Sequence, residues 1–355
     1  MEFYQLNDTN KKKRFKIFDL QRDGKGLSKK SADLGPGMKR FFISYKDNFG
    51  KIVSSNIFMV LGNFPLIFLI ATLAGVTQYS AYLPLSDVFQ NISGLFAADG
   101  ELSPFKLSLF ALEGLQNQTY VPSVWTYVFY GIASLTFVTF GLVNVGTAYI
   151  LRNIASGEPV FVWDDFWYAV KRNWKQALPF GAIDVFICAL LAFNIYSTVT
   201  GAENFFVSVM FWGNVIISIL YFFMRYYIYI QMVTFKLSVF KIIKNSAIFA
   251  LLGIKRNLVA FLGIILGIVL EVLFLFGSGG ILVPFAVAAP LAVMFSSFAY
   301  MKIYAAYYKV KEIMIDPYLA AHPELRPSED AEVIMRDDVS EKERLEEIKK
   351  RNNIE

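Results

Sequence analysis

The sequence from residue 205 to residue 233 reads FFVSVMFWGNVIISILYFFMRYYIYIQMV, and Arg225 is its single charged residue. A bilayer core about 30 Å thick is crossed by roughly 20 mainly apolar residues in an α-helix, so this stretch can span a membrane. The rest of the chain has the same character, since its 355 residues are 55% hydrophobic and only 18% charged. Soluble domains carry about 25% charged residues. The sequence therefore predicts an integral membrane protein.

Further segments meet the same length requirement. Together they predict an all-α fold, a polytopic bundle of about six transmembrane helices, near residues 57–77, 124–150, 178–199, 205–233, 257–277 and 281–308. The polar, basic stretch before them lacks the short apolar core of a cleaved signal peptide, so the first span is expected to remain uncleaved.

Lysine and arginine are unequally divided between the connections of these spans. One alternate set carries almost all of them, while the opposite set, residues 78–123, 200–204 and 278–280, holds only Lys106. Because cytoplasmic loops collect Lys and Arg, both termini are expected in the cytoplasm. The net charge of +5 then reflects orientation in a lipid bilayer, and no nucleic-acid partner is expected.

This pattern divides the chain into three parts. A basic cytoplasmic extension covers 1–50, the membrane domain covers 51–310, and an acidic charged tail covers 311–355. The external loop 78–123 is large enough for two or three short helices packed over the mouth of the bundle. It could be a cap for a ligand or partner, or a passive lid.

Residues 160–177 predict a short cytoplasmic amphipathic helix, with Pro179 marking the turn into the third span. Aromatic side chains at helical spacing give it a face suited to the headgroup level, accompanied by cations that suit a helix C-terminus. The candidate face consists of Trp163, Trp167, Trp174, Lys171 and Arg172. Two interpretations are open: a docking surface for a cytoplasmic partner, or an anchor for the bundle. The loop 234–257 repeats the amphipathic design and is also expected along the inner leaflet.

Charged groups inside spans are costly and point to function. Asp184 lies roughly 9 Å past the cytoplasmic start of the third span, and Arg225 roughly 12 Å before the cytoplasmic end of the fourth, at 1.5 Å per residue. Because a short connection makes these spans antiparallel neighbours, the two side chains could form an ion pair. The alternative is that Arg225 snorkels to the inner headgroups.

Glu271 is a third intramembrane candidate, near the outer end of the fifth span. It continues the small-residue pattern of Gly263 and Gly267 by one turn, which turns it toward a helix-packing face. A proton-coupled transporter could use a carboxylate placed there. The other interpretation is that Glu271 simply reaches water.

Residues for enzymatic chemistry are scarce. The chain has one cysteine, Cys188, in an apolar stretch and one histidine, His322, in the polar tail. These cannot build a disulfide framework, a Cys/His metal site or a histidine-centred catalytic group. Ser278 lies in a glycine turn but has no base on its side of the membrane. We therefore expect a non-enzymatic protein without a cofactor or metal.

Several short motifs resemble the YesL-like family of bacterial integral membrane proteins, also described as domain of unknown function 624. They lie in the family's order across about residues 50–310. The motifs are NIFMVLGNFP at 56–65, SGE at 156–158, DF at 165–166, KRNWKQA at 171–177, FKLS at 235–238 and KNS at 244–246. This chain departs from the family pattern by its N-terminal extension, its enlarged external loop and its acidic tail.

The resemblance implies a multispanning bacterial plasma-membrane protein, typical of Gram-positive lineages. Genes of the family commonly lie beside carbohydrate ABC-transporter and glycoside-degradation genes, and the family supplies no established binding residues. Two hypotheses follow. The first is an accessory or regulatory protein that contacts the subunits of a carbohydrate ABC transporter. The second is a secondary transporter or channel-like permease for a small solute, using Asp184, Arg225 or Glu271.

Overall fold

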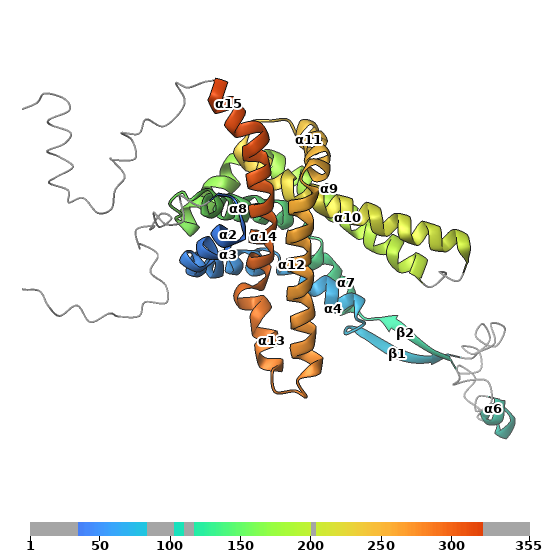
Figure 1. Cartoon of the computed structure of the whole chain (residues 1–355). Helices are drawn as coiled ribbons and strands as arrows, with labels where there is room; N and C mark the ends of the chain where they lie inside the picture. The colour runs from blue at the N-terminus through green and yellow to red at the C-terminus, as the bar shows by residue number, and fades with distance from the viewer. Residues whose placement is uncertain (1–34, 84–102, 110–116, 200–203, 322–355) are drawn as a thin grey trace, which may run out of the picture.

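The computed structural model describes residues 35–83, 103–109, 117–199 and 204–321 (Figure 1). Apolar helices dominate it, and the predicted all-α membrane fold is confirmed. Five helical stretches are long and apolar enough to cross a membrane, and a bent helix pair makes up to six. These stretches are Val124–Ser156, Val162–Val199, Phe205–Thr234, Ile254–Gly277 and Val283–Ala321, with the bent pair Phe49–Gly62 and Pro65–Leu73. The chain is a multi-pass membrane protein.

The bent pair is the first expected span. Helix α3 (Phe49–Gly62) ends before Asn63, and α4 (Pro65–Leu73) continues at a bend of 58°. Proline has no backbone N–H and fits the first position of a helix, so Pro65 starts a new helix rather than extending α3.

The long helices run back and forth through the bundle. Helix α8 (Thr136–Ser156) packs along α9 (Val162–Val199), which pairs in turn with α10 (Phe205–Thr234). Helix α12 (Ile254–Val272) lies beside α14 (Phe295–Val310). The shorter elements are α2 (Met38–Asp47), α7 (Val124–Ala133), α11 (Val239–Leu252), α13 (Val283–Ala289), α15 (Asp316–Ala321) and the π-helical turns η2 (Leu273–Gly277), η3 (Pro290–Met294) and η4 (Lys311–Ile315).

Helix α9 corrects one expectation. The predicted short helix over 160–177 and the turn at Pro179 are wrong, because α9 is one helix of 38 residues with Pro179 inside it. Membrane helices tolerate an internal proline where neighbouring helices support the interrupted backbone. Here the turn around Pro179 is held against α8, since Ala177 and Phe180 are buried and Gly181 lies directly against Gly141.

The external loop differs from its prediction as well. Its described part contains two antiparallel strands, β1 (Gln78–Leu83) and β2 (Asn117–Pro122), in the register Gln78↔Pro122 to Leu83↔Asn117. Only α6 (Pro104–Leu109) is helical among the described residues between them. Figure 1 shows the strands extending away from the helices instead of covering them. Tyrosines and Val121 on these strands favour β-structure. The other short helices predicted for this loop fall in residues 84–102 and 110–116, which lie outside the described part of the chain.

The buried core lies in one half of the bundle, which we call the convergent half. There α8, α9, α10 and α14 come together, and their largest buried side chains include Ile150, Leu151, Ile154, Phe180, Phe223, Tyr226, Tyr227, Ile230 and Tyr300. Beyond it, the α9–α10 pair and the α12–α13 pair diverge (Figure 1). Their outer halves present exposed apolar residues such as Phe193 and Met210.

Helix α2 extends the core to residues before 50. The Phe41 ring stacks on Tyr300 with centroids 5.3 Å apart, and the Ser44 hydroxyl donates to the Ile154 carbonyl at 3.2 Å. The end of the predicted N-terminal extension is therefore packed against the membrane domain.

Candidate functional site

Asp184 and Arg225 form an ion pair inside the bundle. Helix α9 presents Asp184 and α10 presents Arg225, with Arg225 Nε 2.9 Å from Asp184 Oδ1 and 3.1 Å from Oδ2. The Asp184 side chain is 0% exposed and that of Arg225 is 17% exposed. The structure thus adopts the predicted pair, and Arg225 does not snorkel.

Two tyrosines complete this pair. Tyr221 and Tyr229 lie one turn before and one turn after Arg225 on α10, so all three point from the same helix face. The Tyr221 hydroxyl donates to Asp184 Oδ1 at 2.8 Å, and the Tyr229 hydroxyl donates to Oδ2 at 2.5 Å. The Cys188 thiol lies 3.7 Å from Oδ1. Neither tyrosine was among the candidates from the sequence.

The Asp184 carboxylate is saturated by these donors. An ionised carboxylate accepts about four hydrogen bonds, and Arg225, Tyr221, Tyr229 and Cys188 take up this capacity. We call the five residues the Asp184 clasp. It joins α9 to α10, and the Arg225 guanidinium also lies 5.3 Å from the centroid of Phe140 on α8. A closed clasp of this kind stabilises helix packing and leaves Asp184 no free acceptor for a transported cation.

Lys302 is a further charged residue near the clasp that the sequence candidates did not include. It lies on α14, and its ammonium is 5.6 Å from the centroid of Phe222, which precedes Arg225 by three residues on α10. A signal existed in the sequence, because Lys302 is the one charged residue of the predicted span 281–308 and has roughly the depth of the pair.

A second set of polar contacts supports the irregular backbone between α13 and α14. The Asn56 side chain of α3 donates from Nδ2 to the carbonyls of Pro290 and Leu291, both at 2.9 Å. Its Oδ1 accepts from the Ser296 amide at 2.8 Å. Pro290 lacks an N–H and π-helical η3 shifts the hydrogen-bond ladder, so Asn56 satisfies backbone groups that the interruption frees.

Replacing Asn56 with leucine is expected to lower the free energy of unfolding by about 1–3 kcal/mol, because buried backbone groups lose their partner. Thermal unfolding in detergent would measure this loss. Asn144→Leu is the matched control, since among the described residues the Asn144 amide donates only to the Phe140 carbonyl, one turn earlier on its own helix. Equal stability of the two variants would contradict the bridging role of Asn56.

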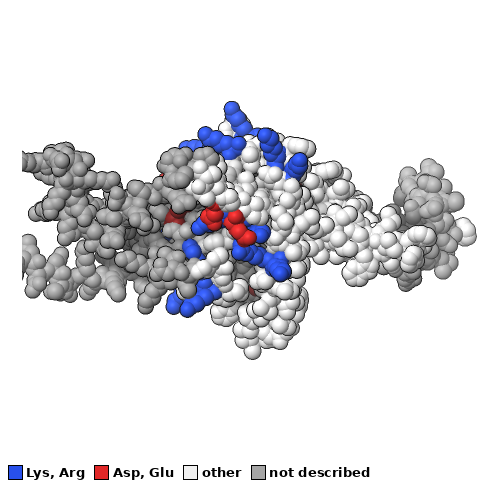
Figure 2. Space-filling view, turned by 45° about the horizontal axis from the view of Figure 1, so that its top comes forward, with Lys and Arg blue, Asp and Glu red and all other residues white. Residues whose placement is uncertain are grey.

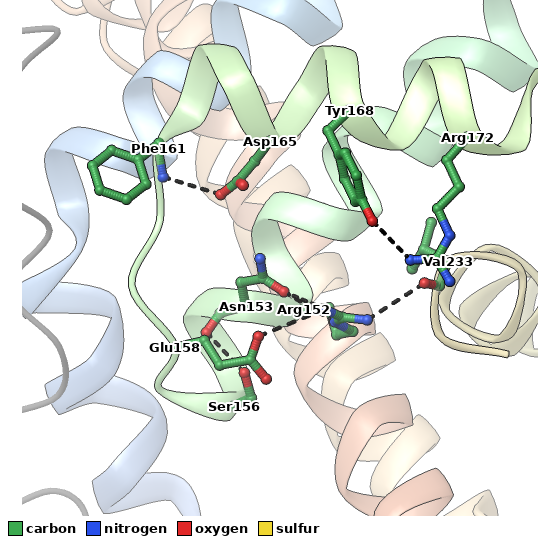
Figure 3. A network of polar contacts seen from close by, with 9 residues as sticks. All are labelled: Arg152, Asn153, Ser156, Glu158, Phe161, Asp165, Tyr168, Arg172 and Val233. Atoms are coloured by element: carbon green, nitrogen blue, oxygen red, sulfur yellow. Dashed lines mark hydrogen bonds and ion pairs between the residues drawn. The ribbon is translucent and has the colours of Figure 1, made fainter. Parts of the chain in front are cut away.

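Another polar network fixes the connection between α8 and α9 (Figure 3). Arg152 donates from Nε to Asn153 Oδ1 at 3.0 Å and from Nη1 to the Val233 carbonyl at 3.4 Å, and its Nη2 lies 3.7 Å from Glu158. Asp165 reaches back to accept the Phe161 amide at 3.0 Å. The loop between α8 and α9 is therefore tied to the end of α10.

The aromatic face of α9 lies beside this network. Trp163, Trp167 and Trp174 are 56%, 41% and 50% exposed, and Lys171 and Arg172 are exposed too. Trp163 also contacts Phe58 of α3 with centroids 5.5 Å apart, and Arg172 donates to Tyr168 at 3.3 Å. This face is available to either a partner or headgroups, and both interpretations stay open.

Glu271 is not part of the clasp. The small-residue pattern before it does face a helix, because a Cβ added at Gly267 would lie 2.5 Å from Phe298 and one at Gly263 would lie 3.2 Å from Met301 Sδ, both on α14. Glu271 follows one turn later and is partly exposed. No described residue forms an ion pair with it.

The described residues contain no group of three or more His, Cys, Asp or Glu side chains able to hold a metal ion. The geometry defines a class, a multi-pass α-helical membrane protein with a closed polar clasp between its helices. No protein-family model, curated protein or solved structure matches the chain.

Proposed function

We propose that this chain is a non-enzymatic accessory or regulatory subunit of a bacterial plasma-membrane import system. The observation that carries the proposal is the large apolar helix surface that the rest of the chain does not bury. Within the most apolar 18-residue segment of each helix, the buried share is 0% for α10, 17% for α9 and 11% for the stretch Ile254–Gly277. Surfaces of this kind can pack against membrane helices of other subunits.

The closed clasp supports the same proposal. A proton- or cation-coupled carrier needs an intramembrane carboxylate that can release its partners, whereas four donors hold Asp184. The resemblance to the YesL-like family suggests the particular system, a carbohydrate ABC importer.

We also propose that the convergent half faces the cytoplasm. Figure 2 shows Lys and Arg gathered away from the β1–β2 end of the molecule, and cations mark the cytoplasmic side of membrane proteins.

Copurification from the membranes of the native cell tests the accessory role. The tagged chain is expected to recover permease and ATP-binding subunits of an importer. If the aromatic face of α9 contributes to docking, the double variant Trp163→Ala, Trp167→Ala recovers several-fold less of them. Trp212→Ala is the control, because Trp212 is a 63% exposed tryptophan on the distant part of α10. Absence of importer subunits at wild-type expression would contradict the proposal.

A second candidate function is a permease for a small solute. The observation that favours it is the contact between two interrupted helices, since α3, which ends at the bend, packs on η3 and Asn56 bridges the two. Interrupted membrane helices form the solute sites of many transporters. Solute flux into vesicles that contain only this chain would support the permease and overturn the accessory role.

A further inference from the structure

The surface of α9 changes from charged to apolar along the helix. Lys171, Arg172 and Lys175 lie in its first half, and all three side chains are exposed. Beyond Lys175 the exposed side chains are mainly apolar, and the one charged residue, Asp184, is buried in the clasp. Because apolar helix surface contacts lipid tails and cations collect at the membrane boundary, the headgroup level on α9 falls near Lys175.

The segment after α10 meets α9 at this same level. The Gln176 side chain donates from Nε2 to the Leu237 carbonyl at 2.9 Å. Lys236 precedes Leu237 in the chain as Lys175 precedes Gln176, and both lysine side chains are exposed. The contact therefore brings cations from two separate segments of the chain to one level of the bundle.

Helix α11 follows directly and continues this surface. The exposed residues of its first half include Lys241 and Lys244 together with Phe240, whose side chain is 78% exposed. In its second half Leu251 and Leu252 are exposed. Cations beside large exposed apolar side chains are typical of a helix at the boundary between headgroups and lipid tails.

We call the six exposed cations of these segments the cationic rim: Lys171, Arg172, Lys175, Lys236, Lys241 and Lys244. The ion pairs between described residues all involve other cations. Aromatic rings accompany the rim, since the Lys175 ammonium lies 5.9 Å from the centroid of Trp174 and the Arg172 guanidinium lies 5.9 Å from that of Tyr168. Tryptophan and tyrosine are enriched at the headgroup level of membrane proteins.

We propose that the cationic rim binds the phosphates of anionic phospholipids, with Trp174 and Phe240 lying among the headgroups. Clusters of Lys and Arg beside membrane helices attract anionic lipids, and the described carboxylates leave these cations free to do so. On α9 and after α10, the cations lie where the exposed apolar surface ends. A lipid leaflet requires this placement, whereas an acidic protein partner does not. The proposal is independent of the accessory role, because a permease would bind the same lipids.

Lipid retention by the purified full chain tests the rim. The tagged chain is equilibrated in detergent micelles that contain a large excess of phosphatidylcholine over phosphatidylglycerol with identical acyl chains, and the retained lipids are quantified by mass spectrometry. The wild type is expected to retain phosphatidylglycerol severalfold above its share of the micelle, and added salt is expected to reduce this preference. Retention of the two lipids in the proportion of the micelle would overturn the proposal.

Variants assign the preference to the rim. Lys175→Gln, Lys236→Gln is expected to retain phosphatidylglycerol near its share of the micelle, whereas Lys175→Arg, Lys236→Arg keeps the preference. Lys39→Gln, Lys46→Gln is the control, because it removes the same charge from two exposed lysines of α2. An equal loss in the control would refute the rim as the lipid site. If the glutamine variant kept its preference for phosphatidylglycerol but lost a copurified acidic protein, the rim would bind a protein partner instead.

Discussion

The Arg225→Leu variant is expected to lose about 3–5 kcal/mol of unfolding free energy, the cost of leaving one member of a buried ion pair without its partner. Asp184 is 0% exposed, so water cannot replace the guanidinium. Tyr221 and Tyr229 would still donate to the carboxylate, but neutral donors supply no counter-charge. Unfolding in mixed micelles, followed by circular dichroism, would measure the loss.

The double variant Arg225→Leu, Asp184→Leu distinguishes the interaction energy of the pair from the contributions of its surroundings. It is expected to recover part of the stability, because the uncompensated carboxylate is gone and two apolar side chains fill the space. Arg172→Leu is a matched control, an exposed arginine of α9 whose described partner is Tyr168. Additive losses in the double-mutant cycle, without a coupling energy, would contradict the pair.

The Asp184–Arg225 pair was predictable because depth along two antiparallel spans is a local property of the sequence. Counting residues from the span ends puts both side chains at one level, and the short connection makes their helices neighbours. Tyr221 and Tyr229 share the helix face of Arg225 at i±4, so the same count could have identified them. The position of Lys302 was harder to predict, because a lysine near a span end usually snorkels. Only the packing of α14 against α10 turns it toward Phe222.

Other features depended on contacts between distant segments. Pro179 stays inside α9 because α8 packs against that turn, and no local signal distinguishes this from a helix break. The strands β1 and β2 are separated by residues 84–116, so their pairing is not a local pattern either. The small-residue pattern of Gly263 and Gly267, by contrast, indicated a packing face correctly because it depends on helical periodicity alone.

Helices α8 and α9 approach each other backbone to backbone at Gly141 and Gly181, one turn before Asp184. A Cβ added at Gly141 would collide with the Ala177 carbonyl oxygen and lie 2.7 Å from Gly181 Cα. A Cβ added at Gly181 would collide with Gly141 Cα and lie 2.5 Å from its nitrogen. Each clash is with backbone atoms, so no change of rotamer can relieve it.

Gly141→Ala and Gly181→Ala are therefore each expected to destabilise the chain by about 3 kcal/mol, the upper part of the usual range for overpacking. Gly131→Ala is the matched control, because nothing lies within 4 Å of a Cβ at that position of α7 and alanine favours a helix more than glycine by about 1 kcal/mol. The same glycine-to-alanine change is thus expected to lower the unfolding free energy at Gly141 and Gly181 and to raise it at Gly131, as measured by unfolding in mixed micelles.

The clash should also weaken the Asp184 clasp, since moving α9 away from α8 draws Asp184 with it and separates Arg225 from Phe140. In a Gly181→Ala background, Arg225→Leu is expected to cost less than in the wild type, because part of the pair is already lost. If Gly141→Ala and Gly131→Ala had the same effect, α8 and α9 would not approach as closely as the structure shows. If the cost of Arg225→Leu were unchanged by Gly181→Ala, the clasp would be independent of that approach.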